Sequence, residues 1–367
     1  MPYPKFDRTK VQMLPLAQRK NKLVFETIRV SAADEPRAIF EPAQRLMAEL
    51  VERIVRARKA GRPVMLSFGA HTIKNGLAPV LIRLINDGWL THLATNGAGI
   101  IHDWEFAFQG QSGEDVAHYV SRGQFGNWQE TGFNINLALN VGACNGLGYG
   151  ESLGAFITNE GLEIPSQDQL RDEVKRELDS NPERAAAAAD MLAIVKEFKL
   201  PAGKFSVPHR HKNFSVQAAA FAKKIPLTGH PMIGHDIIYN HPMNRCACLG
   251  RAAERDFLTF AESVSRLTDG VYISLGSAVM SPMVYEKSLS ITQNVAIQRG
   301  ERIQNHFIVV ADLAKSSWDW TKGEPPQDNP DYYLRYNKTF SRMGGTMRYV
   351  SIDNRDFLLH LFRALAK

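Results

Sequence analysis

Two glycine-containing segments of this 367-residue chain have the residue types that bind nucleotide phosphates. They are Ser67-Phe68-Gly69-Ala70 and Thr95-Asn96-Gly97-Ala98-Gly99. Glycine lets the backbone approach a phosphate closely, and the N–H groups that open a following helix can point at it. Neither segment matches the GxGxxG motif of dinucleotide-binding folds, so tight turns without a ligand are the alternative interpretation. A third segment, Leu275-Gly276-Ser277-Ala278, has the same form. The candidate cofactor-binding residues in these turns are Ser67, Gly69, Thr95, Asn96, Gly97, Gly99, Gly276 and Ser277.

Histidines gather in the second half of the chain. They are His209, His211, His230, His235 and His241, with Asp236 among them. Imidazole and carboxylate groups ligate metals when three or four of them converge. The stretch 228–242 is rich in glycine and proline and is expected to be a loop, where hydrogen bonding to an organic ligand or simple surface exposure is favoured. We therefore predict no metal site, and a metal hydrolase centred on His230, His235 and His241 is the weaker alternative.

Lys338 follows a polar, aromatic segment, residues 328–337, near the C-terminus. A single lysine is ordinarily a solvated surface cation. A lysine buried among aromatic side chains differs, because desolvation favours the neutral amine, which can attack an imine or carbonyl carbon.

The elements that must position these residues form an α/β pattern. An apolar run at 63–69 predicts a strand, residues 77–84 have helical period, and 92–95 predict a second strand. Strand, helix and strand in this order predict a parallel βαβ unit, which places both glycine turns at one sheet edge.

The same pattern continues to the C-terminus. Helices are predicted from Pro42 to about residue 60, from about Met283, and over 353–366, and strands are predicted over 270–276, 306–310 and 347–352. We therefore predict a Rossmann-like fold, a parallel sheet with helices on both faces. The expected organisation is an N-terminal arm (1–40) and a single α/β catalytic domain (41–367), with a helical insertion at about 153–205.

Composition limits the classes of partner. The 44 lysines and arginines and 38 aspartates and glutamates give a net charge of +6, and the basic residues form no long stripe, so no nucleic-acid partner is expected. The three cysteines exclude a disulfide framework. No stretch of about 18 apolar residues is present, so we expect no membrane partner and a cytoplasmic location.

Four segments together resemble the deoxyhypusine synthase family. They are Ser67–Gly76, Thr95–Asp103, the pair Pro226-Leu227-Thr228 and Gly234–Tyr239, and Tyr336-Asn337-Lys338 with Met347–Ser351. The last is similar to the family's Trp-x-Lys nucleophile segment and the strand after it.

The resemblance implies NAD as cofactor, with Asp103 contacting it, and a polyamine-like substrate. Lys338 would be the catalytic residue, carrying the aminoalkyl group as an imine before an acceptor amine takes it. The implied substrate-binding residues are His235, Asp236, Tyr332 and Tyr336. It also implies a homotetramer and raises the possibility of an acceptor protein.

The chain departs from the family pattern around the substrate. Tyr332 stands where the family has an acidic residue, and Gly323-Glu324-Pro325-Pro326 replaces a Gly-Ser-Asp-Ser turn. The donor amine is therefore open. Two alternatives stand beside aminoalkyl transfer to a protein: homospermidine-synthase-like activity on free diamines, and a non-catalytic, oligomeric nucleotide-binding protein.

Overall fold

The computed structural model describes residues 3–366, and the chain divides into two compact units. Unit 1 contains the chain up to Thr27, Ile100–Ala218 and Pro231–Arg255, and unit 2 contains Ile28–Gly99, Ala219–His230 and the chain from Asp256 onward. This division differs from the predicted arm and single domain. The predicted arm (1–40) is divided between the units after Thr27, and the predicted insertion (about 153–205) lies within unit 1.

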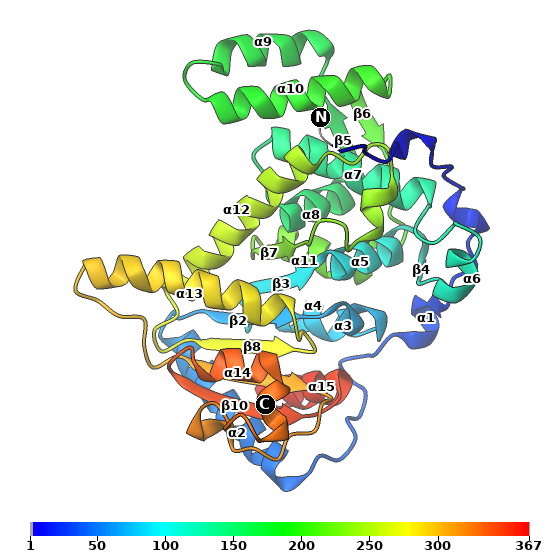
Figure 1. The fold of residues 1–367 in the computed structure, drawn as a ribbon. Helices are drawn as coiled ribbons and strands as arrows, with labels where there is room; N and C mark the ends of the chain where they lie inside the picture. The colour runs from blue at the N-terminus through cyan, green and yellow to red at the C-terminus, as the bar shows by residue number, and fades with distance from the viewer. Residues whose placement is uncertain (1–2, 367) are drawn as a thin grey trace. The chain divides into compact units, whose positions relative to one another are not determined.

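Unit 2 contains a six-stranded parallel sheet, which confirms the predicted α/β fold class (Figure 1). Its strands are β2 (Val64–Phe68), β3 (His92–Asn96), β7 (Leu227–His230), β8 (Val271–Leu275), β9 (Phe307–Asp312) and β10 (Thr346–Ser351). Their order across the sheet is β10-β9-β8-β2-β3-β7. Counted along the chain, this is the 3-2-1-4-5-6 order of Rossmann folds.

Helices cover both faces of this sheet (Figure 1). The helices of unit 2 are α2 (Glu41–Lys59), α3 (Ala70–Lys74), α4 (Ala78–Asn86), α13 (Met280–Gln298), α14 (Arg335–Ser341) and α15 (Asn354–Leu365), with short helices η5 (Trp320–Lys322) and η6 (Pro330–Tyr333). The central strands β2 and β8 are buried along their whole length. Apolar runs without alternation are what a sheet buried on both faces requires.

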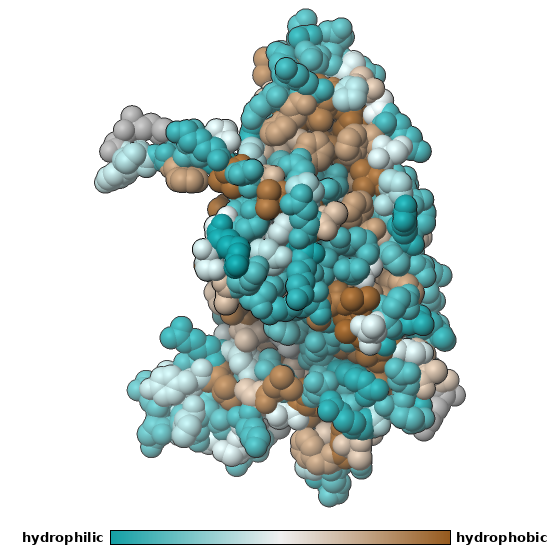
Figure 2. Space-filling view, turned by 90° about the vertical axis from the view of Figure 1, so that its right-hand side faces the viewer, coloured by the Kyte–Doolittle hydropathy of each residue, from teal (hydrophilic) through white to brown (hydrophobic). Residues whose placement is uncertain are grey.

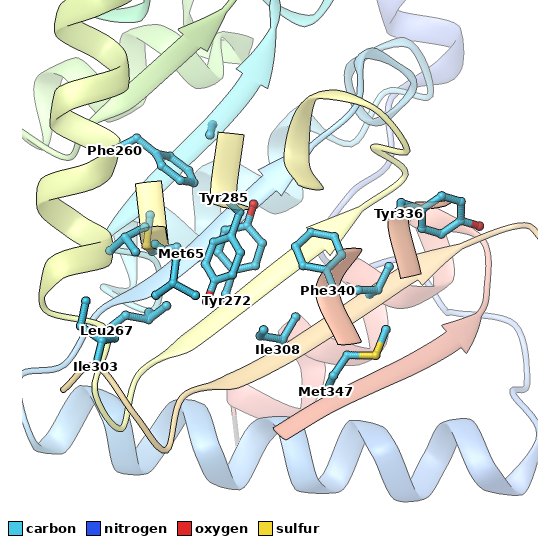
Figure 3. Packing of buried hydrophobic residues seen from close by; sticks show 14 of the residues in the cluster. Met65, Phe260, Leu267, Tyr272, Tyr285, Ile303, Ile308, Tyr336, Phe340 and Met347 are labelled. Carbon is cyan, nitrogen blue, oxygen red and sulfur yellow. The ribbon is translucent and has the colours of Figure 1, made fainter. Parts of the chain in front are cut away.

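Aromatic side chains fill the layer between the sheet and helices α13 and α14. Figure 3 shows Tyr272 of β8 beside Tyr285 of α13 and Phe340 of α14. The ring centroids of Tyr272 and Tyr285 are 4.2 Å apart, and that of Phe340 is 5.8 Å from each. This packing fixes both helices on the sheet.

Most of unit 1 is helical. Its helices are α6 (Val116–Val120), α7 (Gln129–Cys144), α8 (Tyr149–Asn159), α9 (Gln167–Glu177) and α10 (Pro182–Glu197), with short helices η1 (Arg8–Lys10), η2 (Leu16–Gln18), η3 (Lys212–Phe214) and η4 (Ile237–Asn240). Two small antiparallel ribbons pair β1 (Leu23–Val24) with β4 (Gln111–Ser112) and β5 (Gly161–Ile164) with β6 (Gly203–Ser206). Four helices have segments in both units: α1 (Phe25–Ile28), α5 (Gly97–Gln109), α11 (Val216–Ala222) and α12 (Cys246–Ser265).

The N-terminal segment is packed into unit 1. Leu16 is buried, and the guanidinium of Arg19 forms a buried ion pair with Glu105 at 2.7 Å. Thr131 also donates to Glu105. Leu16 and Arg19 are therefore part of the core of unit 1.

Surface composition is ordinary for a globular chain. On the face drawn in Figure 2, hydrophilic residues cover most of the surface and hydrophobic residues gather in separate patches between them. The described chain has no helix that is long and apolar enough to cross a membrane.

Candidate functional site

The strand order of unit 2 reverses between β2 and β8. From β2 the chain continues to β3 and β7 on one side of the sheet, whereas β8, β9 and β10 follow on the other. In open parallel sheets the connections leave in opposite directions at such a point, and ligands bind there, beyond the carboxyl ends of the strands. The segments that follow β2 and β8 are two of the predicted glycine turns.

Gly69 and Gly276 meet at this reversal. The N–H of Gly69 donates to the carbonyl of Leu275 at 3.0 Å, and a Cβ placed on Gly69 would lie 2.0 Å from the carbonyl oxygen of Gly276. Gly276 has φ +56°, in the left-handed region that favours glycine. The close packing of two backbones, with no ligand involved, is thus enough to require glycine at both positions.

Asn354, the first residue of α15, connects the two turns. Its side-chain amide donates to the hydroxyl of Thr72 on α3 at 3.1 Å, and a Cβ on Gly276 would lie 2.8 Å from the same nitrogen. Both Asn354 and Thr72 are buried. We did not predict this residue from the sequence. Its only signal was an amide side chain at the start of the helix that follows the last strand.

Two helix N-termini lie at the same edge. Asn96, the last residue of β3, accepts a hydrogen bond from the N–H of Gly99 at 2.9 Å and so caps α5. Ser277 accepts one from the N–H of Ser281 at 3.2 Å, at the start of α13. Thr95 donates to the carbonyl of Phe68 at 2.9 Å and ties the β3 turn to the β2 turn.

Ser67 and Asp103 have partners within the protein. Ser67 is fully buried and accepts a hydrogen bond from Tyr272 at 2.8 Å. Asp103 lies seven residues past the end of β3, in unit 1, where its carboxylate accepts bonds from the hydroxyl of Ser215 (2.6 Å) and the N–H of Val216 (2.9 Å). Burial raises the pKa of Asp103, and these hydrogen bonds oppose that effect. The cofactor contacts predicted for both residues stay predictions, and their hydrogen bonds hold the fold together.

Lys338 lies in a cradle of aromatic and acidic groups. Its Nζ is 3.5 Å from the centroid of the Tyr332 ring and 3.8 Å from Oε1 of Glu324, and its side chain is 17% exposed. Both contacts attract a positively charged ammonium group. The Lys338 side chain is thus mostly buried, between an aromatic face and a carboxylate.

The rest of this cradle is held by buried polar groups. Asp331 accepts hydrogen bonds from the backbone of Ser317 (2.9 Å) and Trp318 (2.8 Å), which fixes the loop before α14. Tyr336 is buried on α14, and burial raises its pKa. Figure 3 shows its ring near the carboxyl ends of the neighbouring strands. Asn337 is fully buried, with no hydrogen-bond partner for its amide among residues 3–366.

Glu324 is a further candidate site residue that was not predicted from the sequence. It was noted only as part of a departure from the family's turn, yet it places a carboxylate beside Lys338 and also pairs with Arg342 at 2.7 Å. The signal was present in the sequence as an acidic residue before two prolines, 14 residues before the lysine.

His235 and Asp236 belong to unit 1, whereas Lys338, Tyr332 and Tyr336 belong to unit 2. Burial raises the pKa of Asp236 to about 6, while the nearby His235 acts to lower it. One oxygen of Asp236 has no partner among the described residues. A carboxyl group of this kind can exchange a proton near neutral pH.

His209, His230 and His241 are buried in the packing, whereas His235 is exposed. His230 bonds to Thr228 at 2.9 Å, and the same hydroxyl lies 3.0 Å from His92. His241 accepts from the N–H of Met243 at 3.0 Å. Within residues 3–366, no group of three or more His, Cys, Asp and Glu side chains could hold a metal ion. The predicted loop at 228–242 is also corrected, because it begins with the end of strand β7.

No family model matches the chain, and no curated protein matches it. Several solved structures do. Unliganded AgrE has 14% identity and a TM-score of 0.43, with 90% of this chain and 34% of AgrE covered. ArgZ, an arginine dihydrolase from the ornithine-ammonia cycle in cyanobacteria, has 15% identity, a TM-score of 0.44, and 90% and 32% covered. A putative LOR/SDH protein from Methanococcus maripaludis S2 has 13% identity, a TM-score of 0.42, and 92% and 72% covered.

The chain therefore spans about a third of the length of AgrE and ArgZ. AgrE has also been solved in a ternary complex with ornithine and NAD+. None of these three proteins is named as a deoxyhypusine synthase. The resemblance to that family continues to rest on the four sequence segments.

Proposed function

We propose that unit 2 binds NAD at the carboxyl edge of its sheet and that the protein is an NAD-dependent enzyme acting on an amine. The observation that carries the proposal is the reversal of strand order between β2 and β8, with Gly69 and Gly276 packed against each other at that point. In folds with this strand order, that edge is where dinucleotides bind.

The residues at this edge suit a dinucleotide. The turn at Gly276-Ser277 and the N-terminus of α13 offer backbone N–H groups to a pyrophosphate, and the Ser277 hydroxyl can donate another bond. Asn96 ends β3, the second strand of the six-stranded sheet in chain order. Dinucleotide-binding folds place the residue that contacts the adenosine ribose at this position. NAD, when bound, supplies the hydride acceptor.

Within this function we propose aminoalkyl transfer through Lys338. Once the donor carbon is oxidised to an imine, the Lys338 nitrogen adds to it, the original amine leaves, and the C=N bond now joins the fragment to Lys338. An acceptor amine then displaces the Lys338 nitrogen in the same way, so that the C=N bond joins the fragment to the acceptor. The hydride removed in the first step is returned to this imine carbon, and the overall transfer involves no net oxidation. Lys338 must first lose a proton, and Glu324, at 3.8 Å, is placed to hold it.

Borohydride trapping tests both levels of the proposal. The protein is incubated with NAD and a panel of polyamines and diamines, reduced, and measured by intact mass and peptide mapping. We expect an added aminoalkyl mass on Lys338 that requires NAD and is absent in Lys338→Arg. An unchanged mass across the panel would remove the transfer step, and absence of NAD binding in calorimetry would remove the proposal itself.

The same incubations with NAD and amines distinguish two other functions. Homospermidine-type activity predicts product from free diamines without any added protein. A non-catalytic nucleotide-binding protein predicts NAD binding with no amine product and no effect of Lys338→Ala. The observation behind the second of these functions is the pair of contacts that Tyr332 and Glu324 make with Lys338, which hold its side chain in place.

A further inference from the structure

Unit 2 has a hollow at the amino ends of the strands. Its volume is about 820 Å³, within the range of small-molecule sites. Arg62, Arg266 and Arg302 line it, and Glu301 is the only carboxylate among its described lining residues. Ile297 is the only large apolar residue there. A ligand of this hollow would therefore be held by charge and hydrogen bonds.

Sheet topology brings the three arginines together. Arg62 precedes β2, Arg266 lies between α12 and β8, and Arg302 lies between α13 and β9. Because these strands are parallel neighbours, the three loops before them meet at one edge. The five residues of β2 span about 17 Å, so this hollow is separate from the candidate NAD edge.

None of the three guanidinium groups is fully used by the protein. In the described part of the chain, none of them donates a hydrogen bond, and Arg62 and Arg302 have no carboxylate within 4.0 Å. Arg266 faces Glu262 at 3.5 Å, in a pair that is exposed on both sides and so contributes little.

Helix ends provide an ordinary explanation that can be checked. Arg62, Arg266 and Arg302 each follow the C-terminus of a helix, where a cation is favourable. An arginine near a helix end can also donate to the carbonyls there, as Arg58 of α2 donates to the carbonyl of Gly88, just past the end of α4. The three pocket guanidiniums make no such bond among residues 3–366.

We propose that this hollow binds a phosphate-bearing small molecule. Guanidinium groups bind phosphate oxygens through paired N–H donors, and three of them from three loops can surround one dianionic group. The site lies outside the proposed NAD edge and does not depend on it. The volume leaves room for an organic part beyond the phosphate.

Calorimetry on the full-length protein, at about 0.1 M salt, tests this with inorganic phosphate, pyrophosphate and ATP as probes. We expect binding of at least one probe, weakened about tenfold or more by Arg62→Ala or Arg302→Ala. Arg299→Ala, at an exposed arginine of the same loop that does not line the hollow, should leave the affinity within twofold. Glu301→Gln should tighten binding, because it removes the repelling carboxylate.

Several results would overturn the proposal. Binding that persists in the Arg62→Ala/Arg302→Ala double variant would place the phosphate elsewhere and overturn the proposal. So would the absence of heat with all three probes, or binding of duplex DNA in preference to them. Phosphate binding that saturating NAD abolishes, and that Arg62→Ala and Arg302→Ala leave unchanged, would assign the binding to the carboxyl edge instead and overturn the proposal.

Discussion

At the scale of single residues, the neighbours of Lys338 explain the departures from the family pattern. Tyr332 replaces a carboxylate with an aromatic face, and Glu324 returns a carboxylate from a different segment. Charge and cation–π contact are the two ways in which a protein holds an amine cation. If the proposed function holds, these two residues would bind the amine in place of the family's acidic residue.

Glu324→Gln tests whether this carboxylate acts on the Lys338 proton. We expect the rate of imine trapping at neutral pH to fall about a hundredfold or more, as is typical of losing a positioned proton acceptor. Arg342→Met is the matched control, since it removes the other partner of Glu324 without touching Lys338. Equal trapping rates in the Glu324→Gln and parent proteins would exclude the proton-holding role.

The charge of residue 96 should affect the preference between NAD and its 2′-phosphorylated form. An uncharged residue at the end of the second strand does not repel a 2′-phosphate, whereas a carboxylate does. We expect Asn96→Asp to weaken binding of the 2′-phosphorylated cofactor by tenfold or more relative to NAD. Aspartate also caps helices, so α5 should remain folded, which circular dichroism can check. A preference unchanged by Asn96→Asp would place the ribose away from β3.

At the scale of elements, the glycine turns are where backbone geometry limits substitution. Gly69→Ala would drive a Cβ to 2.0 Å from a backbone oxygen, so β2 and β8 would have to separate. We expect a loss of about 4 kcal/mol or more in the free energy of unfolding. Gly250→Ala, in α12 with open space around it, should be neutral or stabilising by up to about 1 kcal/mol. Chemical denaturation measures both, and comparable stability of the two variants would contradict the packing described here.

Buried histidines predict how stability depends on pH. Burial lowers the pKa of His92 and of His230 to about 3, well below the unfolded value of about 6.5. The unfolded chain therefore binds more protons between these values, and stability falls as the pH drops from about 6.5 toward 3. Each histidine contributes a slope of up to about 1.4 kcal/mol per pH unit.

The urea midpoint measured between pH 7 and pH 4 checks this slope. Replacing His92 by Gln should flatten the pH dependence, even if the variant is less stable at pH 7. His118→Gln changes an exposed histidine and serves as the control. A slope that is the same in all three proteins would show that other groups govern acid sensitivity.

The sequence predicted the elements whose patterns are local. The strands at 63–69, 270–276, 306–310 and 347–352 and the helices at 42–60 and 353–366 are all present within a residue or a few. Strong apolar runs and clear helix caps made this possible. At the candidate NAD edge, the glycine turns were found for the same reason.

Elements stabilised by distant partners were not predicted. β7 has only four residues, two of them glycine and histidine, and becomes a strand because it pairs with β3. Helix α7 buries asparagines whose amides bond to carbonyls one turn earlier, as Asn136 does to Gly132, so its sequence lacks an amphipathic pattern. Glu324 and Asn354 were missed for a similar reason, since their partners lie 14 and 282 residues away.

At the scale of the whole molecule, assembly is a further prediction. The family resemblance predicts a homotetramer, for which light scattering should give about 164 kDa, four times the chain mass of 41.1 kDa. A mass near 41 kDa that does not change between micromolar and tens of micromolar protein would contradict this. The same preparation, with NAD added, shows whether the cofactor changes the assembly.

The position of β2 at the centre of the sheet also has a consequence for synthesis. Its first partner, β3, leaves the ribosome some 25 residues later, but its other partner, β8, begins about 200 residues after β2 ends. At ordinary translation rates this delay is about 10–40 s. During that time a largely apolar strand has one unpaired edge, which is a template for aggregation. The nascent chain should therefore depend on chaperones until residue 275 has emerged.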